Sequence, residues 1–283
     1  MTNQTTLQNK STPMTGFPAN FLKIFAALTM LIDHIAVTLV YANLAKQPGY
    51  WNILTSEDSS EWMISLIPED YKSLCSIYFI LRRVGRIAFP LFAFLLVEGF
   101  IHTSNYKRYL TRVGLCALAA EIPFNLVVTS ASGLYNNLEG VTTSIFCWQY
   151  QNTVFTFLIG LLMLWCMRYF EATDATPKAA FRQMFGQVAC VVVAGLLAVL
   201  LRTDYNFFGI LAIAVFYIFR HSKKMMILLG CLVFLQYDVA CLMAFIPIYM
   251  YNGIEVPAKK LKYFFYIFYP AHLLVLYLAT LFV

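Results

Sequence analysis

The first strongly apolar stretch of this sequence contains side chains that could do chemistry. Lys23 and His34 are eleven residues apart, and Asp33 directly precedes the histidine. Eleven helical steps of roughly 100° return to within about 20° of the starting face, over a rise of about 16 Å. One helix face is therefore expected to carry a cation at one end and an imidazole deeper in. Asp33 is turned by roughly 100° from His34, which places it to pair with another segment.

An imidazole in this position can serve as a general base or as a nucleophile. Ionisable groups are costly inside a membrane, where they normally face a cavity or a partner. Two plainer explanations stay open at this point. Lys23 could anchor its helix at the membrane surface, and His34 with Asp33 could hydrogen-bond neighbouring helices.

A second group of charges consists of Arg82, Arg83 and Arg86, shortly before Pro90. The spacings i,i+3 and i,i+4 would let these guanidiniums converge on one anion. Guanidinium is always charged and suits phosphate or carboxylate, and the proline can loosen the helix at this point. The alternative is a basic cluster that binds lipid headgroups.

Other ionisable residues are candidates to orient a catalytic group or to bind an acceptor. Glu121 lies in an apolar stretch before a proline, and His272 follows a proline in the last apolar stretch. Asp204 lies where a stretch ends, and a solvated turn explains it more easily. His102 and His221 lie at the ends of stretches and are expected to have no role. The seven cysteines form no C-x-x-C pair, so neither a disulfide framework nor a metal site is predicted.

The elements that must position these residues are membrane-spanning helices. Of the 283 residues, 60% are hydrophobic and 12% are charged, whereas soluble domains carry about a quarter charged residues. Apolar runs of about twenty residues without alternation predict helices, not a barrel. The net charge of +6 comes largely from short loops between these runs. It therefore indicates positive-inside topology and not nucleic-acid binding.

We predict an all-α, polytopic transmembrane helical bundle of about nine spans. Residues 21–283 would form one domain, after a disordered cytoplasmic tail over residues 1–20. The arginines indicate that the second span tilts or breaks. Polar loops over residues 42–72 and 130–151 are expected outside, where they could contact an acceptor. The expected helices cover residues 21–41, 74–101, 110–129, 152–170, 186–201 and 207–219, two short helices within 225–251 that return to the same side, and 263–283.

Five segments, in this order, resemble the TraX family over nearly the whole membrane region. The segments are Phe25–His34, Arg82–Phe100, Ala120–Phe124, Asp204–Tyr205 with Gly209, and Lys262–His272. That family is named for a conjugation protein implicated in N-terminal acetylation of pilin. A weaker similarity extends to transmembrane acyltransferases, among them the acyltransferase-3 enzymes and heparan-α-glucosaminide acetyltransferase. Acyltransferase-3 proteins carry a basic residue, ten intervening residues and a histidine in their first span, and an arginine cluster before a proline.

The resemblance implies a bacterial cytoplasmic-membrane enzyme that transfers an acetyl group from cytoplasmic acetyl-CoA, without a metal. Its imidazole base or nucleophile would be His34, oriented by Asp33 or Glu121, with His272 as a further catalytic candidate. The residues expected to hold the CoA phosphates are Lys23, Arg82, Arg83 and Arg86.

The acceptor implied by the resemblance is an extracytoplasmic protein or peptide N-terminal amine, such as that of a pilin. O-acetylation of a surface glycan is the alternative within the enzyme class. A transporter or lipid flippase would also explain buried charges, but the two halves show no matched pair of spans broken by glycine or proline. A scaffold of a secretion or conjugation apparatus would leave the cost of burying these charges without a purpose.

Overall fold

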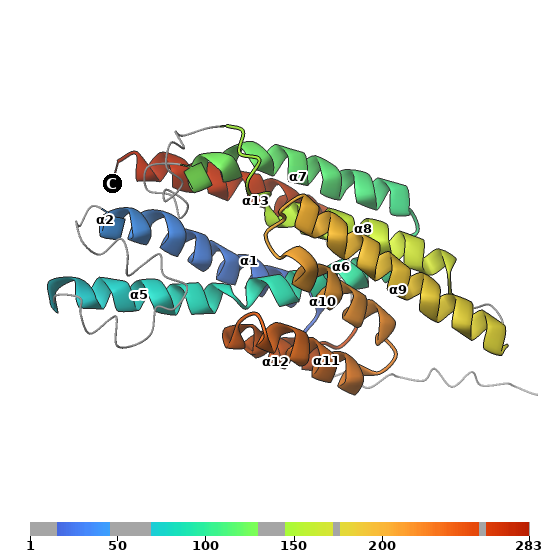
Figure 1. Cartoon of the computed structure of the whole chain (residues 1–283). Coiled ribbons are helices and arrows are strands. Elements are labelled where there is room, and N and C mark those ends of the chain that lie inside the picture. Colours follow the sequence, from blue (N-terminus) through green and yellow to red (C-terminus); the bar gives the residue numbers. More distant parts are fainter. Residues whose placement is uncertain (1–15, 46–68, 130–144, 172–175, 255–258, 283) are drawn as a thin grey trace, which may run out of the picture.

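The computed structural model describes residues 16–45, 69–129, 145–171, 176–254 and 259–282, and its regular elements there are all helices (Figure 1). Residues 1–15 of the predicted tail and most of the two predicted outer loops lie outside the described residues. The elements are α1 (Ala19–Ile35), η1 (Ala36–Val40), α2 (Tyr41–Ala45), α5 (Glu69–Gly85), α6 (Ala88–His102), α7 (Tyr106–Thr129), α8 (Thr153–Tyr169), α9 (Pro177–Leu200), α10 (Asn206–Ile218), α11 (Lys223–Leu235), η2 (Val239–Ala244), α12 (Phe245–Tyr249) and α13 (Lys259–Thr280).

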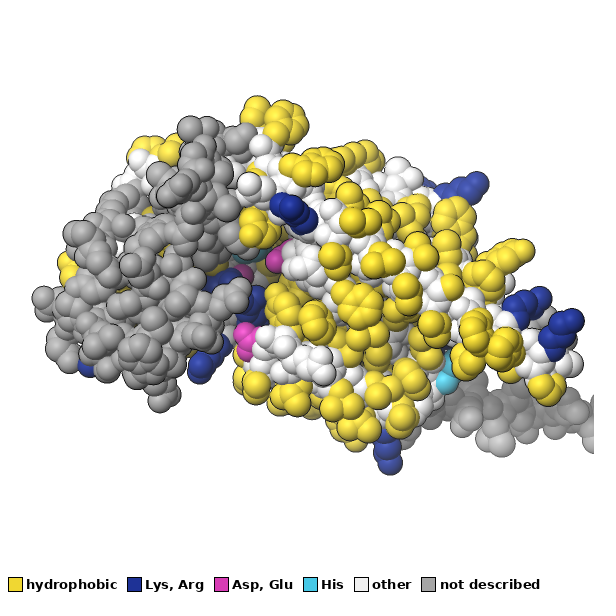
Figure 2. Space-filling model, viewed as in Figure 1, with side chains coloured by type: hydrophobic (Ala, Val, Ile, Leu, Met, Phe, Trp, Pro, Cys, Tyr) yellow, Lys and Arg dark blue, Asp and Glu magenta, His cyan; other side chains and the backbone are white. Residues whose placement is uncertain are grey.

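Several of these helical stretches are long and apolar enough to cross a membrane, which confirms the predicted polytopic bundle. The five long stretches are Ala19–Leu44, Tyr71–His102, Tyr106–Thr129, Pro177–Leu200 and Tyr263–Thr280. Shorter apolar helices cover Thr153–Tyr169, Asn206–Ile218 and Val239–Tyr249. Apolar side chains cover much of the coloured part of the face shown in Figure 2, and Lys and Arg lie at several separate places, among them the end where α9 begins. Such a surface fits lipid as its solvent.

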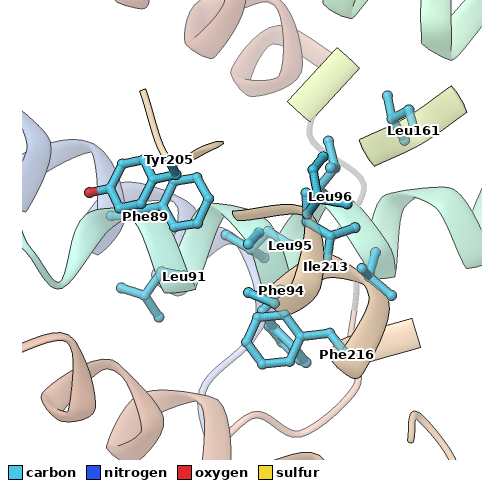
Figure 3. Close-up of a cluster of buried hydrophobic side chains, with 14 of the residues drawn as sticks. Phe89, Leu91, Phe94, Leu95, Leu96, Leu161, Tyr205, Ile213 and Phe216 are labelled. Carbon is cyan, nitrogen blue, oxygen red and sulfur yellow. The ribbon is translucent and has the colours of Figure 1, made fainter. Parts of the chain in front are cut away.

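Helix α6 is the centre of the bundle because its sequence is apolar on every side. Its buried residues pack against α1, α8 and α10. Figure 3 shows Phe94 from α6 beside Phe216 from α10, whose rings meet edge to face at 5.9 Å. Phe89, near the start of α6, stacks on Tyr205 with ring centroids 3.5 Å apart. Ring packing of this kind fixes the start of α6 against the turn before α10.

The predicted second span is broken, as the arginines within it indicated. Helix α5 ends at Gly85 and α6 begins at Ala88. Pro90 has no N–H to donate to the carbonyl of Arg86, four residues earlier, so the helical ladder cannot continue through this point. Ile87 donates to the carbonyl of Val84 instead, which tightens the last turn of α5.

The chain enters α1 from a fixed position. Phe17 donates its backbone N–H to Met250 and accepts one from Asn252, and these two bonds tie the start of α1 to the end of α12. Helix α1 then begins at Ala19, two residues before the predicted start. A π-helical segment, η1, follows His34 almost directly and continues into α2.

The region over residues 225–251 forms two short helical segments, as predicted. Helix α11 leads away from Lys223, and η2 with α12 leads back, because the Lys223 ammonium donates to the carbonyl of Tyr251 at 2.9 Å. Helix α9 begins nine residues earlier than predicted. Thr176 caps it by accepting from Ala179, and Pro177 occupies its first turn. Both features favour a helix start at this point.

Candidate functional site

A cavity of about 600 Å³ lies inside the bundle. Its walls come from α1, α6, α7, the first turn of α8, the turn before α10, and α13. Lys23 and His34 both line it, as expected for two residues on one face of α1. Met30, between them on the helix, lines it as well. The cavity therefore follows α1 over roughly the 16 Å that separates the ammonium-bearing and imidazole-bearing positions along the helix axis.

The two histidines of the predicted site meet in the structure. His34 Nδ1 lies 2.5 Å from His272 Nε2, and His272 Nδ1 lies 2.8 Å from the carbonyl oxygen of Phe268. A carbonyl accepts only, so His272 carries its proton on Nδ1 and its Nε2 is an acceptor. His34 must then donate through Nδ1, which leaves its Nε2 with a free lone pair. This series of hydrogen bonds gives His34 the tautomer that a general base requires.

The π-helical segment after His34 is stabilised locally. In a π turn the usual bond from residue i+4 to the carbonyl of residue i is replaced by a wider one. The Thr38 hydroxyl donates to the His34 carbonyl at 2.5 Å and so satisfies it. Thr38 itself is buried. This bond fixes the backbone from which the imidazole projects.

Asp33 pairs with a different helix from His34, as its rotation on α1 predicted. Its carboxylate accepts from the Arg82 guanidinium at 2.6 Å, joining α1 to α5. Gly85 lies against Asp33 so closely that a side chain there would collide with the carboxylate. Asp33 also lines the cavity, beside His34. In the described contacts, His272 is therefore the residue that fixes the tautomer of His34, and Asp33 forms an ion pair with Arg82 instead.

The predicted arginine cluster has carboxylates as its described partners and does not line the cavity. Arg82 holds Asp33, and Arg86 lies 3.3 Å from Asp238 with its guanidinium over the ring of Tyr237. Arg83 is exposed. The first ion pair joins α5 to α1, and the second joins the break between α5 and α6 to the segment before η2. A role for the cluster in binding cofactor stays a prediction.

Glu121 has a part in holding α8. Asn152 is fully buried, and its side-chain amide donates to Glu121 at 2.6 Å and to the Ala117 carbonyl at 3.0 Å. Its side-chain oxygen caps α8 by accepting from Val154. The described contacts of Glu121 do not include His34, and Glu121 does not line the cavity. Glu121 instead positions the start of α8, whose first residue, Thr153, does line the cavity.

Asp204 and Tyr205 lie in the cavity wall, although a solvated turn was the simpler explanation for Asp204. The Asp204 carboxylate accepts from the Thr153 hydroxyl at 2.5 Å. Two residues of this turn, Arg202 and Asn206, have positive φ values of 52° and 43°. Non-glycine residues in this region carry strain, which the surrounding contacts must hold. The backbone bond from Gln151 to Arg202 is one of them.

Sequence reasoning missed the residues around the other end of the cavity. Arg112 and His102 line it there, together with Thr103 and Ser104 of the turn from α6 to α7. Arg112 was not among the predicted site residues, and His102 was expected to have no role. One signal was available: Arg112 lies near the start of α7, as Lys23 lies near the start of α1. The two helices run in the same direction (Figure 1), so both starts face the same end of the bundle.

The sequence pattern of the TraX protein family matches residues 19–280. The chain belongs to the TraX family. Among curated proteins it is similar to one described as "Probable fimbrial assembly protein FimC, serogroup H1" from Dichelobacter nodosus, with 24% identity over 94% of this chain and 97% of that protein. No solved structure matches the TraX chain. The expected resemblance is therefore confirmed, and it covers α1 to α13.

Proposed function

We propose that this TraX protein is a membrane-embedded acetyltransferase that uses cytoplasmic acetyl-CoA and acetylates an acceptor on the other side of the membrane. The observation that supports this most is the single cavity that Lys23 and His34 both line, with His34 held as a base by His272. Lys23 would bind the anionic cofactor, and the pantetheine arm would extend along α1 to bring the thioester to His34. The implied cofactor thus fits the charge and length of this cavity.

The orientation proposed for the chain follows from its basic residues. Arg108, Arg168 and Lys223 lie at the helix ends on the Lys23 side of the bundle. Lys and Arg concentrate in cytoplasmic segments of membrane proteins. We therefore place the Lys23 end in the cytoplasm and the His34 end toward the outside. Acetyl-CoA would then enter from the compartment that contains it.

In the proposed reaction the acceptor nucleophile attacks the thioester carbonyl, and a new bond from the acceptor to the acetyl carbon forms. His34 Nε2 takes the proton of the nucleophile. The carbon–sulfur bond breaks as the tetrahedral intermediate collapses, and the imidazolium returns the proton to the departing CoA thiolate. His272 stabilises the imidazolium because its Nε2 accepts from His34 Nδ1 throughout.

The acceptor we propose is an amine, such as the N-terminus of a pilin-like protein. Asp33 is neutralised by Arg82, but Asp204 gives the His34 end of the cavity a carboxylate whose described partner is a neutral hydroxyl. A carboxylate attracts a protonated amine more than a neutral sugar hydroxyl. The bound ammonium must then release one proton to solvent before its nitrogen attacks, and His34 takes the second proton. The similar protein from Dichelobacter nodosus is described as a fimbrial assembly protein, which supports a fimbrial or pilin subunit as the acceptor.

The test is transfer of radiolabelled acetyl from acetyl-CoA to a pilin-derived N-terminal peptide, with purified protein in lipid nanodiscs. His34→Ala should retain acetyl-CoA binding and lose transfer by about 100-fold or more, the usual contribution of a positioned base. His221→Ala is the matched control, because His221 is exposed and absent from the cavity wall. Transfer by His34→Ala at the rate of the control would remove His34 from the mechanism.

A further inference from the structure

The charged residues that line the cavity are separated by sign. Both carboxylates in the wall, Asp33 and Asp204, lie at the His34 end. Both permanent cations in the described wall, Lys23 and Arg112, lie at the opposite end, near the starts of α1 and α7. A wall with its cations at one end and its carboxylates at the other is suited to a ligand that is anionic at one end only.

The cationic end also offers hydrogen-bond donors suited to an anion. Lys23 and Arg112 are both half-buried. The Arg112 Nε–H is bonded to the Arg108 carbonyl at 3.2 Å, which anchors the guanidinium to its own helix. Thr103 and Ser104 bring hydroxyls to the same part of the wall. An ammonium, an anchored guanidinium and hydroxyls together are the donors that proteins use for phosphate groups.

The distance from this end to His34 is the one that acetyl-CoA would need. Arg112 lies nine residues before Glu121, a rise of roughly 14 Å along α7. Glu121 is bonded to Asn152, next to Thr153 of the cavity wall at the His34 end. The corresponding rise on α1, from Lys23 to His34, is roughly 16 Å. Both helices therefore separate the cations from the base by a span that an extended pantetheine arm can bridge.

We propose that Lys23 and Arg112 together form the phosphate-binding site for the nucleotide end of CoA, and that Arg82, Arg83 and Arg86 do not. This inference rests on the proposed acetyltransferase function. Arg82 and Arg86 are held by Asp33 and Asp238, outside the cavity wall. A phosphate would have to displace those carboxylates to reach them. Lys23 and Arg112 instead line the same cavity as His34.

The experiment is equilibrium binding of radiolabelled acetyl-CoA, and its displacement by adenosine 3′,5′-bisphosphate, to the full chain in nanodiscs. The bisphosphate has the phosphates but no pantetheine. Lys23→Gln and Arg112→Gln should each weaken binding of both probes about tenfold or more, the value of one charge-assisted hydrogen bond. The control is Arg108→Gln, one helical turn from Arg112 but exposed and outside the wall. It should bind both probes as the wild type does.

Each result has one meaning. Affinity within about twofold of wild type in both variants, with normal binding by the wild type, would overturn the phosphate site alone. Absence of acetyl-CoA binding by the wild type would overturn the proposed function and this inference together. If a variant loses binding because it misfolds, its thermal unfolding midpoint will fall below that of Arg108→Gln. In that case the affinity of Arg112→Lys for the bisphosphate is measured, because this variant keeps the charge. If Arg112→Lys does not restore most of that affinity, the proposed phosphate site is wrong.

Discussion

Replacement of His272 by phenylalanine tests the hydrogen-bonded chain that gives His34 its tautomer. Phenylalanine preserves the ring that stacks on Phe268, 4.8 Å between centroids, but it has no acceptor for His34 Nδ1. A buried donor left without a partner costs about 1–3 kcal/mol. If the cost falls on the catalytically competent orientation of His34, the rate of transfer falls by roughly 5- to 150-fold, since about 1.36 kcal/mol corresponds to tenfold. Acetyl-CoA affinity should not change.

Glutamine at position 272 is the conservative variant, because its side-chain oxygen can accept from His34 as the imidazole nitrogen does. His272→Gln should therefore keep most of the activity that His272→Phe loses. The assay is transfer of labelled acetyl to a peptide acceptor, with kcat and KM for acetyl-CoA determined separately. A fall in kcat without a rise in KM locates the effect in the chemical step. Combining His272→Phe with His34→Ala should cost no more than His34→Ala alone.

Two results would refute the reasoning about His272. If the phenylalanine and glutamine variants transfer acetyl equally fast, the hydrogen bond at 2.5 Å between the two imidazoles has no part in catalysis. If the double variant is slower than His34→Ala by the full factor of His272→Phe, the two residues act independently. His272 would then have a role of its own, and the proton assignment through the Phe268 carbonyl would be wrong.

Further predictions concern the contacts that hold the cavity wall. Gly85→Ala forces a methyl group into Asp33 and should lower the free energy of unfolding by about 1–3 kcal/mol. The control is Gly114→Ala, where a methyl group meets only ordinary contacts and should leave the thermal unfolding midpoint in nanodiscs unchanged. Equal midpoints for the Gly85→Ala and Gly114→Ala variants would show that α5 adapts. Asn152→Ala removes the cap of α8, worth about 1 kcal/mol, and should destabilise the chain in the same assay. Asp204→Asn should raise KM for a peptide amine while acetyl-CoA affinity stays constant, and an unchanged KM would remove the carboxylate from acceptor binding.

Much of the fold follows from the sequence because hydrophobic length alone identifies a membrane span. The start of α9 could not be placed in this way, since Pro177 and Thr176 cap a helix that continues beyond its apolar part. The break between α5 and α6 could be predicted, because a proline removes a specific donor from a helix that also contains three arginines. The start of α1 at Ala19 depends on a distant contact between Phe17 and Met250, which no local pattern contains.

The site was predictable where one helix carries it and not where two helices meet. The spacing of Lys23 and His34 is a property of α1 alone, and both residues do line one cavity. The choice of His272 as partner for His34 depends on how α13 packs beside α1, 238 residues later in the chain. Arg112 was missed for the same reason. Its contribution to the wall depends on the level at which α7 lies beside the other helices.

The layout of the cavity favours the proposed transferase over a transporter. His34 lies fifteen residues into α1, roughly 22 Å from its start, and Glu121 lies equally far into α7. At this level α8 begins at Thr153 and the turn before α10 bears Asp204, both in the cavity wall. A transporter needs two gates that open in turn on the two sides of its binding site. A fixed base at one end of a cavity, with cations at the other, lets donor and acceptor meet from opposite sides without such a movement.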